Sequence, residues 1–136
     1  MRVLNGFVFI FTFVHCAFPC TVTISDIKAK AVYGRVVDEY KAAIPYAKVQ
    51  IYKDTENGEK VLSETKADEN GRFEIKNFPA GKYMIRAGAE YFTYSFASMK
   101  LKKSSSAVKS KEIVFTLVPF GSCSGWVEMQ KIQKSK

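Results

Sequence analysis

The sequence predicts an all-β protein, and more narrowly a seven-stranded Greek-key β-sandwich. Helical periodicity is nearly absent, and short runs rich in β-branched and aromatic residues recur along the chain instead. Turn signals rich in Gly, Asn and Pro separate these runs. The 136 residues are one domain's length, and 14% of them are aromatic, which is sufficient for a packed core. The seven expected strands cover residues 31–38, 47–53, 60–67, 72–76, 82–87, 91–101 and 112–118.

Glycine turns separate the second, third and fourth of these strands. The run 31–38 places valines around a single glycine, and in 47–53 Ala, Val and Ile alternate with Lys, Gln and Tyr, so one face is expected to be buried. Asn57-Gly58 predicts a hairpin, because both residues tolerate a positive φ. Asn70-Gly71 predicts a second tight turn before the fourth strand.

The last three strands repeat the pattern. Pro79 and Gly81 form a turn that reverses the chain, so that Tyr83 enters the same core as Phe73. The run 91–101 carries many aromatic residues, and in 112–118 the side chains of Ile113, Phe115 and Leu117 are expected to point inward. The expected centre of the core consists of Phe73, Ile75, Tyr83, Ile85, Phe115 and Leu117.

The N-terminus has the pattern of a secretory signal. Arg2 precedes an apolar run from Phe7 to Val14, and small residues or Cys follow. Cleavage after Cys16 is expected, with Ala17 as the alternative last residue removed and a lipid on Cys16 or Cys20 as a weaker alternative. The other interpretation of the run is a buried first strand. The expected organisation is a signal peptide (1–16), an N-terminal linker (17–29), the sandwich (30–119) and a C-terminal tail (120–136), loose or forming a short docked helix.

Two cysteines remain after such a cleavage. Cys20 precedes the expected sandwich and Cys123 follows its last strand, so in an oxidising compartment they would join the two ends. A loop of roughly 100 residues closed in this way is worth up to ~4.7 kcal/mol in the chain-entropy model. The alternative is two separate thiols.

Several stretches resemble one known family. The central one is TKADENGRFEI at 65–75, which leads into FPAGKYMI at 78–85. The opening VYGRV at 32–36 with IPYAKV at 44–49, and the exit IVFTLVP at 113–119, fit the same pattern. This is similar to carboxypeptidase regulatory-like domains, a branch of the prealbumin-like, or transthyretin-like, sandwiches. The resemblance implies the fold, and it implies roles such as adhesion, envelope attachment or assistance to a larger enzyme or transporter.

The sequence offers little for catalysis. Its single histidine, His15, lies in the expected signal, which removes histidine-based acid–base chemistry and the usual zinc sites. Hydroxyisourate hydrolases resemble transthyretin but rely on histidines and a different C-terminal ending. Asp68, Glu69 and Asn70 crowd oxygen atoms into one turn, yet they are too few for calcium. No enzyme activity, cofactor or metal is therefore expected.

Two surface features suggest binding. Tyr91, Phe92 and Tyr94 are candidates for a ligand platform, although Phe92, like Phe96, is expected in the core. Five lysines and no acid lie between Lys100 and Lys111, which would suit an anionic surface or form a solvated edge. Nucleic acid is not the expected partner. The leading expectation is a protein exported to the envelope, periplasm or exterior that binds a protein or polysaccharide there, and the alternative is a carbohydrate-binding module.

Overall fold

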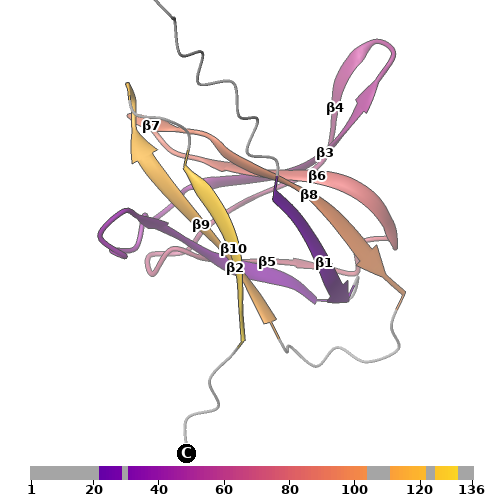
Figure 1. Ribbon diagram of the computed structural model, residues 1–136, viewed down its shortest axis with the longest axis horizontal. Coiled ribbons are helices and arrows are strands. Elements are labelled where there is room, and N and C mark those ends of the chain that lie inside the picture. The colour runs from indigo at the N-terminus through magenta and orange to yellow at the C-terminus, as the bar shows by residue number, and fades with distance from the viewer. Residues whose placement is uncertain (1–21, 29–30, 104–110, 122–124, 132–136) are drawn as a thin grey trace, which may run out of the picture.

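The computed structural model describes residues 22–28, 31–103, 111–121 and 125–131, and these parts form two β-sheets packed face to face (Figure 1). Each sheet has five strands, so the expected all-β sandwich is confirmed. The strands are β1 (Val22–Lys28), β2 (Ala31–Asp38), β3 (Lys48–Thr55), β4 (Gly58–Lys66), β5 (Arg72–Lys76), β6 (Gly81–Gly88), β7 (Phe92–Thr93), β8 (Ser95–Lys102), β9 (Lys111–Pro119) and β10 (Trp126–Lys131).

The first sheet has the strand order β1-β8-β6-β3-β4, and the second has the order β10-β9-β2-β5 with β7 paired to β9. Most neighbours are antiparallel, but β1 pairs with β8 and β2 with β9 in parallel. The hairpin of β3 and β4 turns at Gly58, whose φ of 101° is one that few residues with a Cβ adopt. Figure 1 shows the end of this hairpin projecting from the body of the sandwich.

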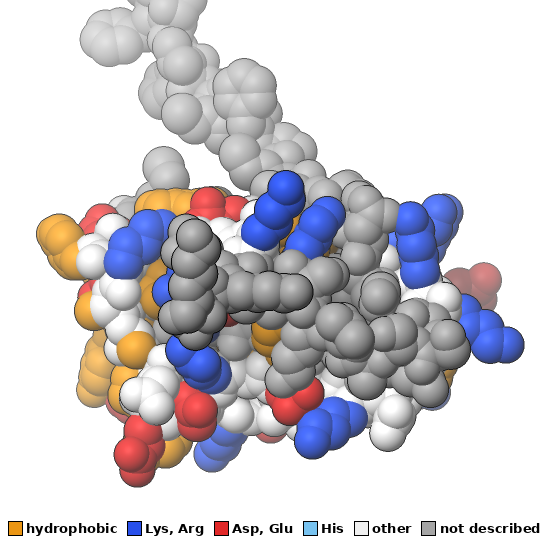
Figure 2. Space-filling model, turned by 90° about the horizontal axis from the view of Figure 1, so that it is seen from below, with side chains coloured by type: hydrophobic (Ala, Val, Ile, Leu, Met, Phe, Trp, Pro, Cys, Tyr) orange, Lys and Arg blue, Asp and Glu red, His pale blue; other side chains and the backbone are white. Residues whose placement is uncertain are grey.

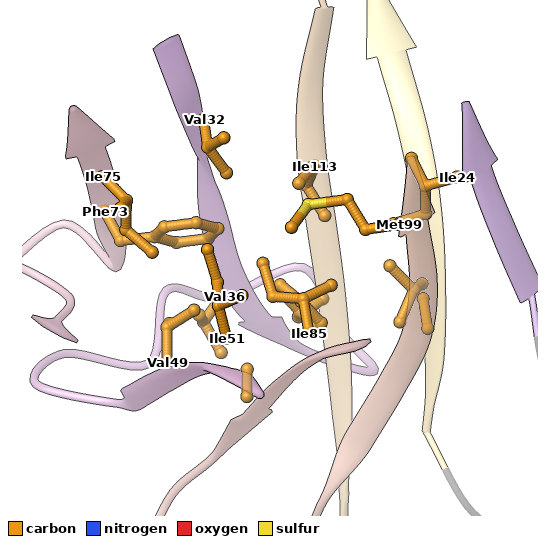
Figure 3. Packing of buried hydrophobic residues seen from close by; sticks show 14 of the residues in the cluster. Ile24, Val32, Val36, Val49, Ile51, Phe73, Ile75, Ile85, Met99 and Ile113 are labelled. Atoms are coloured by element: carbon orange, nitrogen blue, oxygen red, sulfur yellow. The ribbon is translucent and has the colours of Figure 1, made fainter. Parts of the chain in front are cut away.

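The core lies between the two inner faces. Figure 3 shows Val49, Ile51 and Ile85 of the first sheet beside Val36 and Phe73 of the second. All six residues expected at the centre are buried, and the rings of Phe73 and Phe115 lie 5.9 Å apart. The alternation of the sequence therefore places one face of each strand inward, as the pleat of a strand requires.

A close approach of strands explains one glycine. Gly34 in β2 pairs with Ile113 of β9 on one side and with Phe73 of β5 on the other. A Cβ at this position would overlap the carbonyl oxygen of Ile113 and lie 2.9 Å from Cζ of Phe73. A residue with a side chain would therefore push β2 and β9 apart.

The turns expected before β5 and β6 have the backbone that glycine favours. Gly71 has a φ of 72° and Gly81 a φ of 154°. At the first turn, the Asp68 carboxylate accepts hydrogen bonds from the backbone N–H groups of Asn70 and Arg72, both at 2.8 Å. Pro79 lies exposed in the loop between β5 and β6.

The strand count and the chain ends differ from the prediction. The described parts contain ten strands rather than seven. β1 lies in the segment expected as a linker, and β10 in the segment expected as a loose tail or helix. In β10, Val127 and Met129 pack inward while Trp126 faces out. This alternation with a period of two is that of a strand, and the prediction of a loose tail or a short docked helix was wrong. Within the described residues, no helix is long and apolar enough to cross a membrane.

Candidate functional site

Four aromatic side chains surround one open groove. They are exposed to different degrees: Tyr91 by 72%, Phe120 by 69%, Tyr46 by 61% and Tyr94 by 49%. The groove has a volume of about 500 Å³, and its lining also includes Lys48, Lys66, Gly88, Ala89, Glu90 and Phe92. Figure 2, which views the molecule from below, shows hydrophobic side chains reaching the surface at its left-hand end.

Exposure and not size distinguishes this groove from others on the surface. A polar hollow of about 550 Å³ lies beside Arg35, Lys41 and Arg72, and another of about 530 Å³ lies beside Leu62 and Phe78. The volumes are nearly equal, but four large exposed rings gather only at the first of these three. Clustered exposed aromatic side chains typically mark binding surfaces.

The segment after β6 holds Tyr91 and Tyr94, and backbone hydrogen bonds place Tyr91 next to Phe120. The Phe92 N–H donates to the Ala89 carbonyl at 3.2 Å, which closes a tight turn and leaves Tyr91 with a φ of 67°. The Phe120 N–H in turn donates to the Tyr91 carbonyl at 3.1 Å. Because β7 also pairs with the end of β9, Tyr91 and Phe120 are fixed beside each other.

Tyr46 reaches the groove from the loop before β3. Its φ is 58°, and its hydroxyl donates to Oε1 of Glu69 at 3.3 Å. Tyrosine rarely adopts left-handed backbone, which costs roughly 1–2 kcal/mol per residue. Two of the four rings in the groove therefore stand on strained backbone, and such strain concentrates at functional sites.

Tyr94 lies against Gly88 on the outer face of the first sheet. A Cβ on Gly88 would overlap Cε1 and Cδ1 of the Tyr94 ring and lie 2.9 Å from its Cζ, so the ring occupies the space that a side chain would take. The guanidinium of Arg86 lies 5.6 Å from the Tyr94 ring centroid and 4.6 Å from that of Tyr52. The Tyr94 ring is thus supported by Gly88 on one side and has the Arg86 guanidinium as a cationic neighbour.

Hydrogen bonds hold Arg86 in place. Its Nε donates to Oε1 of Gln50 at 2.8 Å, and one Nη atom pairs with Oε2 of Glu59 at 2.7 Å. Burial raises the pKa of Tyr52, Glu59 raises it further, and Arg86 opposes both effects. This network braces the side of the groove formed by β3 and β6.

Two lysines contribute positive charge to the groove. Lys48 of β3 and Lys66 of β4 are directly opposite each other in the antiparallel register. Lys48 lies 3.9 Å from Oε1 of Glu64, with both side chains almost half exposed, so this ion pair is weak. Among the described residues no carboxylate pairs with Lys66.

Of the three residues predicted to form a ligand platform, two have the expected exposure. Tyr91 and Tyr94 are exposed and line the groove, whereas Phe92 is half-buried and packs against the core. Phe96 was expected in the core but faces outward with 39% of its surface exposed, so that expectation is wrong. The reason is a change of sheet, because β7 pairs within the second sheet and β8 within the first, and the inward face shifts at Tyr94.

Seven of the ten residues that line the groove were not predicted from the sequence. Tyr46, Lys48, Lys66 and Phe120 reach it from three other parts of the chain. Only the pairing of β3 with β4 and β6, and of β7 with β9, brings them together. In the sequence, Tyr46 is a single tyrosine after a proline and Phe120 follows the last expected strand. Neither feature indicates on which surface of the fold the side chain lies.

Other predicted residues are only partly described. Cys20 and Cys123 lie outside the described residues. Lys100 and Lys102 are exposed on β8, and Lys111 begins β9, but residues 104–110 are outside the description. Among the residues described, no group of three or more His, Cys, Asp or Glu side chains could hold a metal ion.

Comparison with known proteins decides the family. The family model of the carboxypeptidase regulatory-like domain matches residues 31–110, more than half of the chain. The chain belongs to the carboxypeptidase regulatory-like domain family. The expected family resemblance is thereby confirmed, and the strands β1, β9 and β10 lie outside the matched residues.

Solved structures with the same fold are distant in sequence. Sea bream transthyretin in complex with thyroxine has a TM-score of 0.53 and 14% identity, covering 77% of this chain and 98% of that one. Klebsiella pneumoniae 5-hydroxyisourate hydrolase has a TM-score of 0.50 and 12% identity, covering 79% of this chain and 97% of that one. At such identities the likeness concerns the fold alone. None of the curated proteins matches the sequence of this chain.

Proposed function

We propose that this carboxypeptidase regulatory-like domain is an exported, non-catalytic binding module that holds a carbohydrate in the aromatic groove. The observation that carries the proposal is the gathering of Tyr46, Tyr91, Tyr94 and Phe120, all exposed, around one hollow. By holding a polysaccharide of the envelope or the exterior in this groove, the domain would act in adhesion.

The chemistry of the groove suits a sugar. The C–H bonds on one side of a pyranose form an apolar surface that stacks on an aromatic ring, while the ring hydroxyls need hydrogen-bond partners. Tyr91 and Phe120 offer ring faces, and the hydroxyl of Tyr46 and the carboxylate of Glu90 offer polar contacts. Because the groove is open, several linked sugar units fit it better than one small enclosed ligand.

The charged groups of the groove support binding and not hydrolysis. Glycoside hydrolysis ordinarily requires a pair of carboxyl groups flanking the bond that breaks. Among the residues that line the groove, Glu90 alone carries a carboxylate. The strained backbone of Tyr46 and Tyr91 is better explained by presentation of their rings than by general acid–base catalysis.

Export is supported by the sequence. Arg2 and the apolar run from Phe7 to Val14 have the order of a secretory signal. An exported location would place the groove where polysaccharides are abundant.

Titration with soluble oligosaccharides tests the proposal. Hexamers of cellulose, xylan, chitin and polygalacturonate would be titrated calorimetrically into the purified protein, and at least one should bind. Replacing Tyr91 or Phe120 by Ala should then weaken that binding about three- to tenfold, the value of one ring contact. Tyr40→Ala is the matched control, because Tyr40 is 83% exposed but does not line the groove. Equal losses in the groove and control variants, or no binding of any hexamer, would refute the proposal.

A further inference from the structure

The strand register places two lysines and one aromatic ring in a single row on the outer face of the first sheet. Lys66 of β4 is opposite Lys48 of β3, and Lys48 is in turn opposite Gly88 of β6. Tyr94 covers Gly88, so its ring takes the third place in the row. Adjacent strands lie about 4.8 Å apart, so each step along the row is close to the width of a sugar ring.

Like charges directly opposite each other across two strands destabilise a sheet. Glu64 offsets this only in part, because its contact with Lys48 is 3.9 Å long and exposed to water. Lys66 has no partner carboxylate among the described residues. The pair thus offers two ammonium groups that an external anion can neutralise.

On the basis of the proposed function, we infer that the groove selects an acidic saccharide. The ring that carries the acid stacks on Tyr94, and its carboxylate or sulfate oxygens accept hydrogen bonds from the ammonium groups of Lys48 and Lys66. An ionised partner makes such hydrogen bonds roughly twice as strong as neutral ones. A neutral sugar would leave Lys66 without a carboxylate partner among the described residues, and Lys48 with only its 3.9 Å contact to Glu64.

The two sources of the anion can be separated by matched ligands. Hexamers of polygalacturonate and alginate carry carboxylates, and their methyl esters keep the rings but remove the charge. A carrageenan hexamer carries sulfate esters, and its desulfated form is the neutral counterpart. We expect one acidic class to bind at least about tenfold more tightly than its neutral counterpart, with an affinity that falls between 50 and 500 mM NaCl.

Charge variants locate the effect. Lys48→Gln and Lys66→Gln should each remove most of the preference for the acid, about five- to tenfold, because they delete an ammonium group without shortening the side chain much. Lys60→Gln is the control, because it removes the same charge from the same strand outside the groove. Lys66→Gln should also leave the midpoint of urea unfolding unchanged or higher, because it relieves the like-charge pair.

The outcomes separate this inference from the proposed function. If neutral esters bind as well as the acids and Tyr91→Ala weakens both, the groove is a sugar site and the inference is wrong. If Lys60→Gln weakens acid binding as much as Lys66→Gln does, the attraction is general positive charge, and the inference is again wrong. If no saccharide of either kind binds, both the inference and the proposed function fall.

Discussion

Replacing each of two glycines by alanine should distinguish residues needed for ligand binding from residues needed for stability. At Gly88, the atoms nearest to an added Cβ all belong to the ring of Tyr94, a side chain that can swing outward into the groove. At Gly34, an added Cβ would meet the carbonyl oxygen of Ile113, which is backbone and cannot move without separating β2 from β9. Gly88→Ala should therefore damage binding, and Gly34→Ala should damage stability.

The expected cost of Gly88→Ala follows from the exposure of Tyr94. The ring is 49% exposed, so displacing it completely returns about half of a tyrosine, ~100 Å², to water. At about 25 cal/mol per Å² this is ~2.5 kcal/mol. Alanine is favoured over glycine in a strand by roughly 0.5–1 kcal/mol, which offsets part of the loss. The net destabilisation should not exceed ~2 kcal/mol, while oligosaccharide affinity should fall at least about tenfold.

Gly34→Ala should cost more. Overpacking a well-packed interior typically costs about 1–3 kcal/mol even where side chains can adjust. Here a rigid carbonyl and the buried ring of Phe73 are both in the way, so a loss above ~3 kcal/mol is expected. Gly58→Ala is the control for both, because nothing lies within 4 Å of an added Cβ there, although its φ of 101° carries a backbone cost.

Urea unfolding followed by tryptophan fluorescence would give the stabilities, and calorimetric titration the affinities. If Gly88→Ala binds like the wild type, the Tyr94 ring is not part of the ligand platform. If Gly34→Ala is as stable as Gly88→Ala, the close pairing of β2 with β9 is wrong.

Three further predictions concern the core, a tyrosine and the chain ends. Phe73→Ala should destabilise the protein by about 3–5 kcal/mol in urea, since the ring is buried beside Phe115, and a loss below ~1 kcal/mol would contradict its place in the core. Burial, and secondarily Glu112, raise the pKa of Tyr33 to about 12 from an ordinary value of 10.0, so the folded protein should retain this proton longer and lose stability as pH rises from 10 toward 12. Urea unfolding between pH 10 and 12 should show a steeper fall in stability for the wild type than for Tyr33→Phe, and absorbance titration at 295 nm should show one tyrosine that ionises near pH 12 in the wild type and is missing from the variant. Peptide mapping of the exported protein without reductant should recover Cys20 linked to Cys123, whereas two alkylatable thiols or a lipid would argue against the bridge.

The sequence was sufficient for the fold because the information lay in local alternation. Residues 31–38 and 72–76 were predicted with the bounds that β2 and β5 have in the structure. Glycine turns between alternating runs fix which face is inward within each hairpin, and no knowledge of partners is needed. Val127 and Met129 show the same alternation, but it was too short to predict a strand in place of a C-terminal tail.

The groove depended on pairings that no local pattern encodes. Phe96 was wrongly assigned to the core because β7 and β8 belong to different sheets. Tyr46 and Phe120 reach the groove only through the pairing of segments distant in sequence. Sequence alone could identify aromatic candidates, but it could not tell which of them share a surface.

A nuclear magnetic resonance titration tests the central claim most directly. The ¹⁵N-labelled protein would be titrated with a polygalacturonate hexamer and with its methyl ester, and backbone amide shifts followed residue by residue. The account predicts that the largest shifts fall at Tyr46, Lys48 and Lys66 and within the segments 88–94 and 118–121, and that the acid saturates at lower concentration. Shifts centred on other surfaces, such as the hairpin end near Gly58, or no shifts with any acidic or neutral hexamer, would contradict it.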